Sequence, residues 1–182
     1  AVREPVALEG YWQSEGCFSH CADTVRRVFR FAAFRNQEQT ALAETMARTP
    51  NAVSVHVRRG DYEKPPFKAL FSICGDAYYR NALAKLRSLV HDAHLFVFSD
   101  EPEWVSANFY GQGLPVTVVS RPGAEEPWHD MHLMACCRHH ILANSPFSWW
   151  GAWLSKEEGV GITPGTGVHQ QERERGPDIG PA

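Results

Sequence analysis

The sequence predicts an α/β fold in which helices cover a parallel sheet. Two observations favour this class: short β-branched runs alternate with longer helical patterns from residue 51 onward, and several of those runs are almost continuously apolar. Such runs are typical of strands that are buried on both faces, as they are in parallel sheets. The chain has 182 residues, 43% hydrophobic and 21% charged, which suits one globular domain with a core and excludes a disordered chain.

The elements follow from local periodicity. Asp76 is the expected N-cap of a helix, because Tyr79, Leu83, Leu86 and Val90 repeat at helical spacing on one face. The other elements of the sheet region are expected, in order, as strands over 52–58, 94–100, 115–120, 139–144 and 159–163, and as helices over 101–109 and 127–137 and from Pro146.

The two ends of the chain differ from this alternating region. Residues 1–50 contain two helical patterns, over 22–31 and 36–48, and we expect them to be a helical remnant of an amino-side region or a lobe connection. Residues 51–164 are expected to form the sheet domain. The composition of residues 165–182 is too polar to pack, which predicts a disordered tail.

Charge and cysteine content exclude several classes of partner. The formal net charge of -3 leaves no overall basic field for a nucleic acid, so any polyanion must be met locally. The apolar stretches are far shorter than the ~20 residues of a bilayer-spanning helix. Five cysteines, with Cys136 next to Cys137, cannot form a complete set of internal disulfides, which favours a reducing cytoplasm.

The first candidate site lies at the end of the first strand, in the motif HVRRGDY. Strand alternation places His56 and Arg58 on one face and Arg59 on the other, so the two arginines cannot do the same job. Ligands of parallel α/β sheets bind beyond the carboxyl ends of the strands, and an arginine fork matches phosphate oxygens. The alternative is a pair of structural ion pairs, such as Arg59 with Asp61.

Two further candidates follow later strands. Asp100 ends the second strand, where a carboxylate accepts hydrogen bonds from a ribose or a purine edge, or caps the helix that follows. The third candidate starts the helix at Pro146, where hydroxyls and backbone amides offer an anion site; the alternative is simple helix capping, which is compatible with phosphate binding. Its residues are Asn144, Ser145, Phe147 and Ser148.

Other chemically suggestive residues carry less weight. The histidines and cysteines between His129 and His140 run along a helix into a strand rather than in the spaced pairs of zinc sites, so no metal is expected. The tryptophans of the last helix have the spacing of core residues. Tyr62 and Phe67 follow HVRRGD and are placed for a sugar contact, or for a lid on the core.

Taken in order and spacing, GYWQSE, HVRRGDY, FSDEPEW, DMHLMACCRHHIL and ANSPFSWWGAWL resemble the inverting α-1,2-fucosyltransferases over residues 10–164. HVRRGD alone is shared with α-1,6-fucosyltransferases and, more loosely, with protein O-fucosyltransferases. The resemblance implies a GT-B-like enzyme whose carboxyl-side, Rossmann-like lobe binds GDP-fucose without a metal or other cofactor and transfers fucose to the 2-hydroxyl of a galactoside.

The resemblance also implies residue roles. Arg58 would hold the β-phosphate, His56 and Asp100 would contact the guanine or its ribose, and Ser145 and Ser148 would lie near the diphosphate. Asp61 is a candidate for the base that deprotonates the acceptor hydroxyl, although it would equally well support one of the arginines.

The chain departs from the family at its amino-terminal side. No segment matches the family's glycine-rich G-G-L-G-N-Q pattern, so the chain resembles the carboxyl-side part alone. The alternatives are a fucosyltransferase with a chitooligosaccharide or protein acceptor, and a non-catalytic GDP-binding fragment. Bacterial members of the family are cytoplasmic and often peripheral to the membrane, whereas animal members lie in the Golgi membrane.

Overall fold

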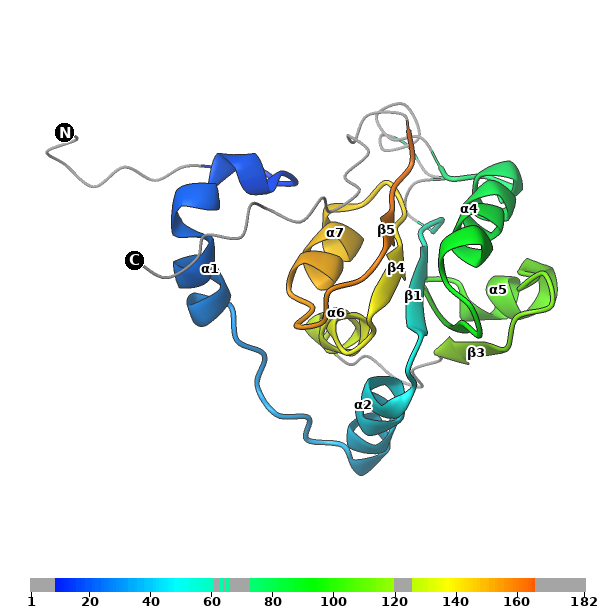
Figure 1. The fold of residues 1–182 in the computed structure, drawn as a ribbon, viewed down its shortest axis with the longest axis horizontal. Helices are drawn as coiled ribbons and strands as arrows, with labels where there is room; N and C mark the ends of the chain where they lie inside the picture. The colour runs from blue at the N-terminus through cyan, green and yellow to red at the C-terminus, as the bar shows by residue number, and fades with distance from the viewer. Residues whose placement is uncertain (1–8, 61–62, 64, 66–72, 120–125, 166–182) are drawn as a thin grey trace, which may run out of the picture.

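Five parallel strands form a single sheet at the centre of the molecule (Figure 1), a computed structural model that describes residues 9–60, 63, 65, 73–119 and 126–165. The strands lie in the order β3-β2-β1-β4-β5, and every neighbouring pair is parallel. This arrangement confirms the predicted α/β class. The strands are β1 (Ala52–Val57), β2 (His94–Ser99), β3 (Val116–Val119), β4 (His139–Ile141) and β5 (Gly161–Ile162).

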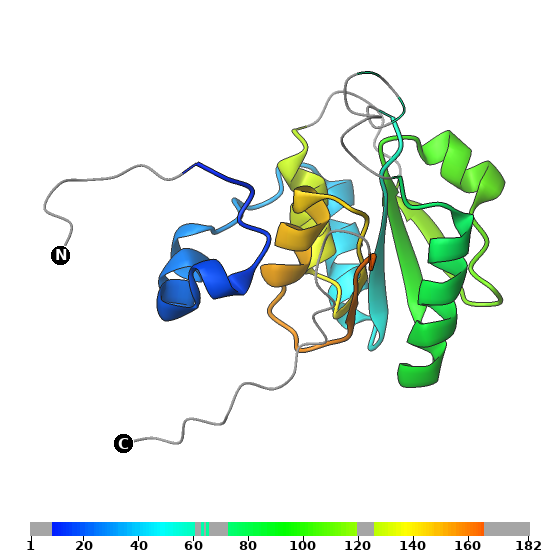
Figure 2. The same ribbon diagram turned by 90° about the horizontal axis from the view of Figure 1, so that it is seen from above.

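Helices cover both faces of the sheet (Figure 2). The helices α4 and α5 lie on one face, and α2, α6 and α7 lie on the other, while α1 packs outside α7. The helices are α1 (Ala22–Val28), α2 (Gln37–Arg48), α4 (Asp76–Leu89), α5 (Pro102–Asn108), α6 (Trp128–Ala135) and α7 (Pro146–Trp153), with 3-10 turns at Glu15–Cys17 and Ser19–Cys21.

The strand β1 supplies side chains to both layers, since all six of its residues are buried. Val55 and its alternate neighbours pack against Leu83 and Leu86 of α4. On the other face, Phe96 and Phe98 of β2 pack with side chains of α2 and α6. Burying each such side chain stabilises the fold by roughly 1.5–3 kcal/mol. The end of β1 is therefore held firmly between two cores.

The tryptophans of α7 are core residues, as their spacing predicts. Trp149 and Trp153 are buried, and Phe18 packs edge-on against Trp153 with ring centroids 5.1 Å apart. The Arg26 guanidinium lies 3.9 Å from the centre of the Trp153 ring and donates a hydrogen bond to the Trp153 carbonyl. These contacts fix the segment before residue 30 onto the sheet domain.

Several predicted boundaries were wrong. The N-cap of α4 is Gly75, and Asp76 is the first helical residue, where its carboxylate pairs with Arg80 at 2.9 Å. The helix predicted over 22–31 ends at Val28, and the fourth strand ends at Ile141 rather than at residue 144. β4 ends where its partner β5 ends, because β5 contributes only two paired residues.

Parts of the prediction fall outside the described residues: Asp61, Tyr62, Phe67, Ser120 and the tail from residue 166. All five cysteines are free thiols, in agreement with the prediction from their number. Among the residues that the structure describes, no helix combines the length and the apolar character needed to cross a membrane.

Candidate functional site

The strand order creates a topological switch point beside β1. From β1 the chain adds β2 and β3 on one side, and it then returns to add β4 and β5 on the other. The loops that leave β1 and β4 therefore turn to opposite faces at the carboxyl edge of the sheet. Open α/β sheets bind ligands in the crevice at such a point. His56 lies in β1, Arg58 directly follows it and Ser145 follows β4, so the candidates lie at this crevice.

Asp100 orients the arginine pair instead of capping a helix. Its Oδ2 lies 3.5 Å from Arg58 Nε, and its Oδ1 accepts a hydrogen bond from the Arg59 backbone N–H at 3.1 Å. The N-cap of α5 is Glu101, whose own N–H donates to Ser99 Oγ, so the capping role of Asp100 was wrong. A carboxylate that holds one edge of a guanidinium fixes the direction of its other donors.

Gly60 permits this arrangement. A Cβ at Gly60 would lie 2.7 Å from Asp100 Oδ2, closer than real Cβ contacts come. The glycine of HVRRGDY is therefore needed for the approach of Asp100 to the arginines.

His56 is a buried, neutral imidazole beside the arginine. It is 4% exposed, its ring centroid lies 5.7 Å from that of Phe147, and its Nδ1 has no hydrogen-bond partner among the described residues. Burial, with a smaller contribution from the Arg58 charge, lowers the pKa of His56 to about 3. A buried polar atom without a partner is costly, and a ligand atom would satisfy it.

Because the pKa of His56 is far below the 6.5 of an unfolded histidine, the unfolded chain takes up this proton first on acidification. We expect the free energy of unfolding to be unaffected above pH 6.5 and then to fall towards about pH 3, by up to ~1.4 kcal/mol per pH unit from this group. His56→Gln should remove that component. Urea titrations of both proteins near neutrality and near pH 5 measure it, and parallel profiles would contradict the assignment.

Arg59 faces the other layer, as strand alternation predicts. Its guanidinium carbon lies 3.8 Å from the centre of the Trp104 ring, and its Nε lies 3.3 Å from Glu101 Oε2. A second ion pair joins it to Glu63 at 2.5 Å. The sequence analysis gave structural ion pairs, such as one with Asp61, as the alternative role of this arginine. The structure has such ion pairs, and their partners are Glu63 and Glu101. A part for Arg59 in binding the nucleotide sugar stays a prediction.

Two tyrosines that the sequence analysis did not single out as polar groups brace the switch point. Tyr79 Oη donates to the His56 carbonyl at 2.9 Å, and Tyr78 Oη donates to the Leu142 carbonyl at 2.6 Å. Burial raises the pKa of both phenols, so they stay protonated donors. The first turn of α4 thus joins the ends of β1 and β4. The sequence did contain a signal for this role, namely two adjacent tyrosines in the first turn of a predicted helix.

At the start of α7, the two serines predicted to bind an anion differ in their hydrogen bonds. Ser145 is the buried N-cap, yet its side chain makes no capping hydrogen bond. Ser148 Oγ donates to the Ala143 and Ser145 carbonyls at 3.3 and 3.1 Å, so its proton holds the turn. A phosphate needs donors, which favours Ser145 over Ser148 as a ligand.

Asn144 and Phe147 support the same turn. The Asn144 backbone hydrogen-bonds the Cys74 sulfur, whose pKa burial nevertheless raises. The Phe147 ring is half-buried against the second core and faces His56. These contacts indicate that Asn144 and Phe147 shape the crevice, and their predicted part in binding the nucleotide sugar stays a prediction.

Asp130 is an acidic group that the sequence analysis missed. It lies in the first turn of α6, is 9% exposed, and follows β3 at the same edge of the sheet as Asp100. A carboxylate in the first turn is stabilised by the helix dipole, but one so buried is uncommon. The signal was available in the sequence, where Asp130 interrupts an otherwise apolar and aromatic helix.

The described residues hold no group of three or more histidine, cysteine, aspartate or glutamate side chains that could bind a metal ion. His132 stacks on Phe31 and Phe34 with ring centroids 4.5 and 4.2 Å away, and the His129 ring is tilted against that of Trp128. Burial lowers the pKa of His132 to about 4.

Fold and site together define a Rossmann-like α/β protein with an arginine, a buried histidine and a carboxylate at its switch point. The chain belongs to glycosyl transferase family 11, whose model matches residues 4–178. This confirms the family that the motifs indicate.

The relatives give this assignment detail. The chain is 31% identical to an alpha-1,2-colitosyltransferase of Escherichia coli over 94% of this chain and 59% of that protein. It is 32% identical to the human galactoside alpha-(1,2)-fucosyltransferase 1 over 85% of this chain and 44% of that protein. The chain thus spans about half the length of these relatives.

A solved structure shares the fold. The alpha-1,6-fucosyltransferase NodZ, in a crystal soaked with GDP-fucose, superposes with a TM-score of 0.51 over 73% of this chain and 47% of that chain, at 23% sequence identity. At this identity the likeness concerns the fold alone, and it supports the Rossmann-like architecture.

Proposed function

We propose that this chain carries the donor site of a galactoside 2-α-L-fucosyltransferase, which transfers L-fucose from GDP-fucose to the 2-hydroxyl of a galactoside with inversion. The observation that carries the proposal is the Arg58–Asp100 pair at the switch point, in a chain of family 11. Relatives named for α-1,2 transfer support the linkage.

The chemistry calls for a fixed positive charge. Cleaving the bond between fucose and phosphate leaves negative charge on GDP while the sugar becomes oxocarbenium-like. Arg58 is oriented in advance by Asp100, so it stabilises that charge without reorganising during the reaction. On this proposal Arg58 takes the place of a metal ion, and no metal or other cofactor is required.

The remaining polar groups have matching roles in the proposal. The Nδ1 atom of His56, buried without a partner among the described residues, is suited to one polar atom of the guanosine. Ser145 and the N-terminus of α7 are suited to the diphosphate. Inversion also needs a base on the acceptor side, and Asp61 remains our prediction for that role, outside the described residues.

Calorimetric titration of the chain with GDP-fucose, with and without EDTA, tests the donor site. We expect binding that EDTA does not change. Incubation with lactose, followed by linkage analysis of any product, tests the transfer itself. Binding without turnover would indicate a GDP-binding fragment, a different product linkage would indicate another acceptor, and binding that EDTA abolishes would contradict the metal-free donor site.

A second candidate donor follows from one relative. The relative that covers 94% of this chain is named as a colitosyltransferase, so a colitose nucleotide is the alternative to GDP-fucose. Competition of the two nucleotide sugars in the same titration distinguishes them, because the preferred donor binds more tightly or turns over faster.

A further inference from the structure

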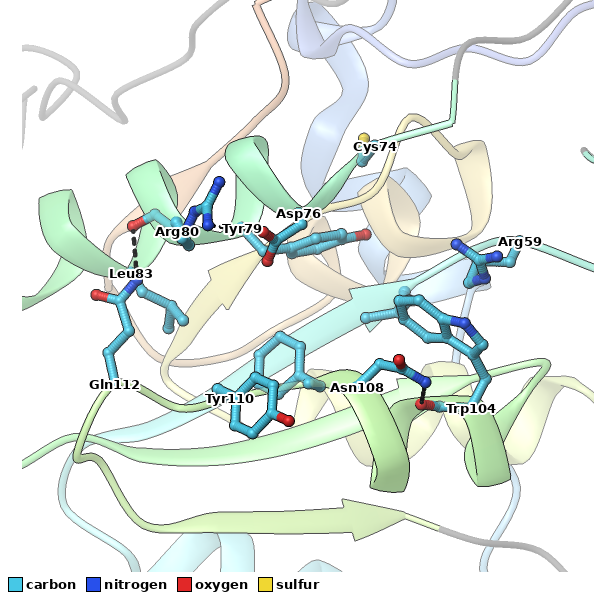
Figure 3. Close-up of a pocket in the computed structure, with 12 residues that line it drawn as sticks. Arg59, Cys74, Asp76, Tyr79, Arg80, Leu83, Trp104, Asn108, Tyr110 and Gln112 are labelled. Atoms are coloured by element: carbon cyan, nitrogen blue, oxygen red, sulfur yellow. Dashed lines mark hydrogen bonds and ion pairs between the residues drawn. The ribbon is translucent and has the colours of Figure 1, made fainter.

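A groove with a volume of about 510 Å³ runs between α4 and α5, on the sheet face opposite Arg58 (Figure 3). Its size lies within the roughly 300–1,000 Å³ of small-molecule sites. Arg59 lies at one end of the groove and Gln112 at the other. The groove therefore begins at the residue that follows Arg58 in the sequence. Its polar and aromatic lining includes Arg59, Asp76, Arg80, Trp104, Asn108, Tyr110 and Gln112.

Both arginines that line the groove are paired with carboxylates in it or beside it. Arg59 is paired with Glu101 and Glu63, and Arg80 is paired with Asp76 at 2.9 Å. A phosphate would have to compete with these carboxylates for either guanidinium. Because Arg59 has two carboxylate partners and Arg80 has one, the groove holds little uncompensated positive charge and favours an uncharged ligand.

The polar groups of the groove are suited to a ligand with many hydroxyls. Asn108 donates through its amide to the Trp104 carbonyl at 2.8 Å, and Gln112 donates to the Arg80 carbonyl at 3.3 Å. These bonds orient the two amides, each of which also has a carbonyl oxygen that accepts hydrogen bonds.

Aromatic rings complete the lining. Tyr110 is 76% exposed although it lines the groove, where Figure 3 shows it on the same side as Asn108 and facing α4. The Trp104 indole is held by the Arg59 guanidinium on its face. A large exposed ring beside oriented amides offers the C–H face of a pyranose an apolar platform and its hydroxyls polar partners.

We propose that this groove binds the neutral saccharide chain of the acceptor, beyond the galactose that receives the fucose. The inference rests on the proposed function, because that function identifies the saccharide as the acceptor. The groove's preference for a neutral saccharide rests on the residues that line it. Tyr110 supplies the stacking surface, and Asn108 and Gln112 supply hydrogen-bond partners.

The test uses the 182-residue chain and an uncharged tetrasaccharide ending in galactose, with binding measured by calorimetry and by saturation-transfer NMR. Tyr110→Ala should weaken tetrasaccharide binding roughly tenfold, the loss of one aromatic platform. Tyr110→Phe, which keeps the ring, should bind within about twofold of the native chain. Tyr11→Ala, a tyrosine 68% exposed elsewhere on the surface, is the matched control and should change nothing.

A parallel titration with GDP separates this inference from the proposed function. Tetrasaccharide binding that depends on the Tyr110 ring supports the groove even if GDP does not bind, and in that case the donor proposal fails alone. Absence of tetrasaccharide binding by the native chain overturns the inference, as does equal binding by the native chain and Tyr110→Ala.

Discussion

Arg58→Ala is expected to lower transfer, measured as kcat/KM, by roughly 10²–10³-fold, because it removes a fixed donor to the charge that develops on the leaving diphosphate. GDP affinity should fall by at least about tenfold, since a hydrogen bond to a charged group is lost. Arg58→Lys should recover only part of the activity, because lysine restores the charge but not the planar fork that pairs with Asp100.

The matched control is Arg48→Ala. Arg48 is exposed on α2, where it pairs with Glu44 at 3.2 Å, so its loss should leave GDP binding and transfer unchanged. Circular dichroism and urea unfolding should show that all three variants are folded. If Arg58→Ala is folded and binds GDP as tightly as the native chain, the arginine is not the diphosphate anchor.

Among the glycines that the structure describes, Gly159 is the one whose replacement by alanine is expected to cost the most stability. A Cβ at Gly159 would lie 1.8 Å from the Arg138 carbonyl oxygen and 2.7 Å from its carbon, so the backbone must move. The next residue, Val160, donates its N–H to His139 Nδ1 at 3.0 Å and accepts from the His140 N–H at 2.9 Å. We expect a loss of about 3 kcal/mol, at the upper end for overpacking.

Gly161→Ala is the control for this prediction. Gly161 lies two residues away in β5, and a Cβ there would meet no atom within 4 Å. Thermal unfolding should show Gly161→Ala close to the native chain and Gly159→Ala lower by roughly 10 °C. Equal melting temperatures would mean that the segment before β5 relaxes without loss of its hydrogen bonds.

The sequence predicted the features that are set by local periodicity. The pleat of β1 predicts that Arg59 lies on the opposite face of the sheet from His56 and Arg58. Helical spacing predicts the burial of Trp149 and Trp153. The parallel sheet follows from the alternation of strands and helices. None of these predictions required knowledge of which segments meet in space.

The errors concern contacts between segments that are distant in sequence. Asp100 read alone is a plausible helix cap, and only the pairing of β1 with β2 brings it to the arginines. Arg59 could not be paired with Glu101 for the same reason. One local feature was also not predicted: Ser148 donates to the Ala143 and Ser145 carbonyls, which depends on the geometry of a single turn, while a ligand role for Ser148 stays a prediction.

The pleat at the end of β1 limits which changes in chain length this protein can tolerate. Deleting one residue within β1 would move every following side chain to the opposite layer, so Arg58 would turn towards Trp104 and Arg59 towards Phe147. The same slip would turn valines out of a core that holds them fully buried. Insertions and deletions are thus excluded from residues 52–59, even where single substitutions are accepted.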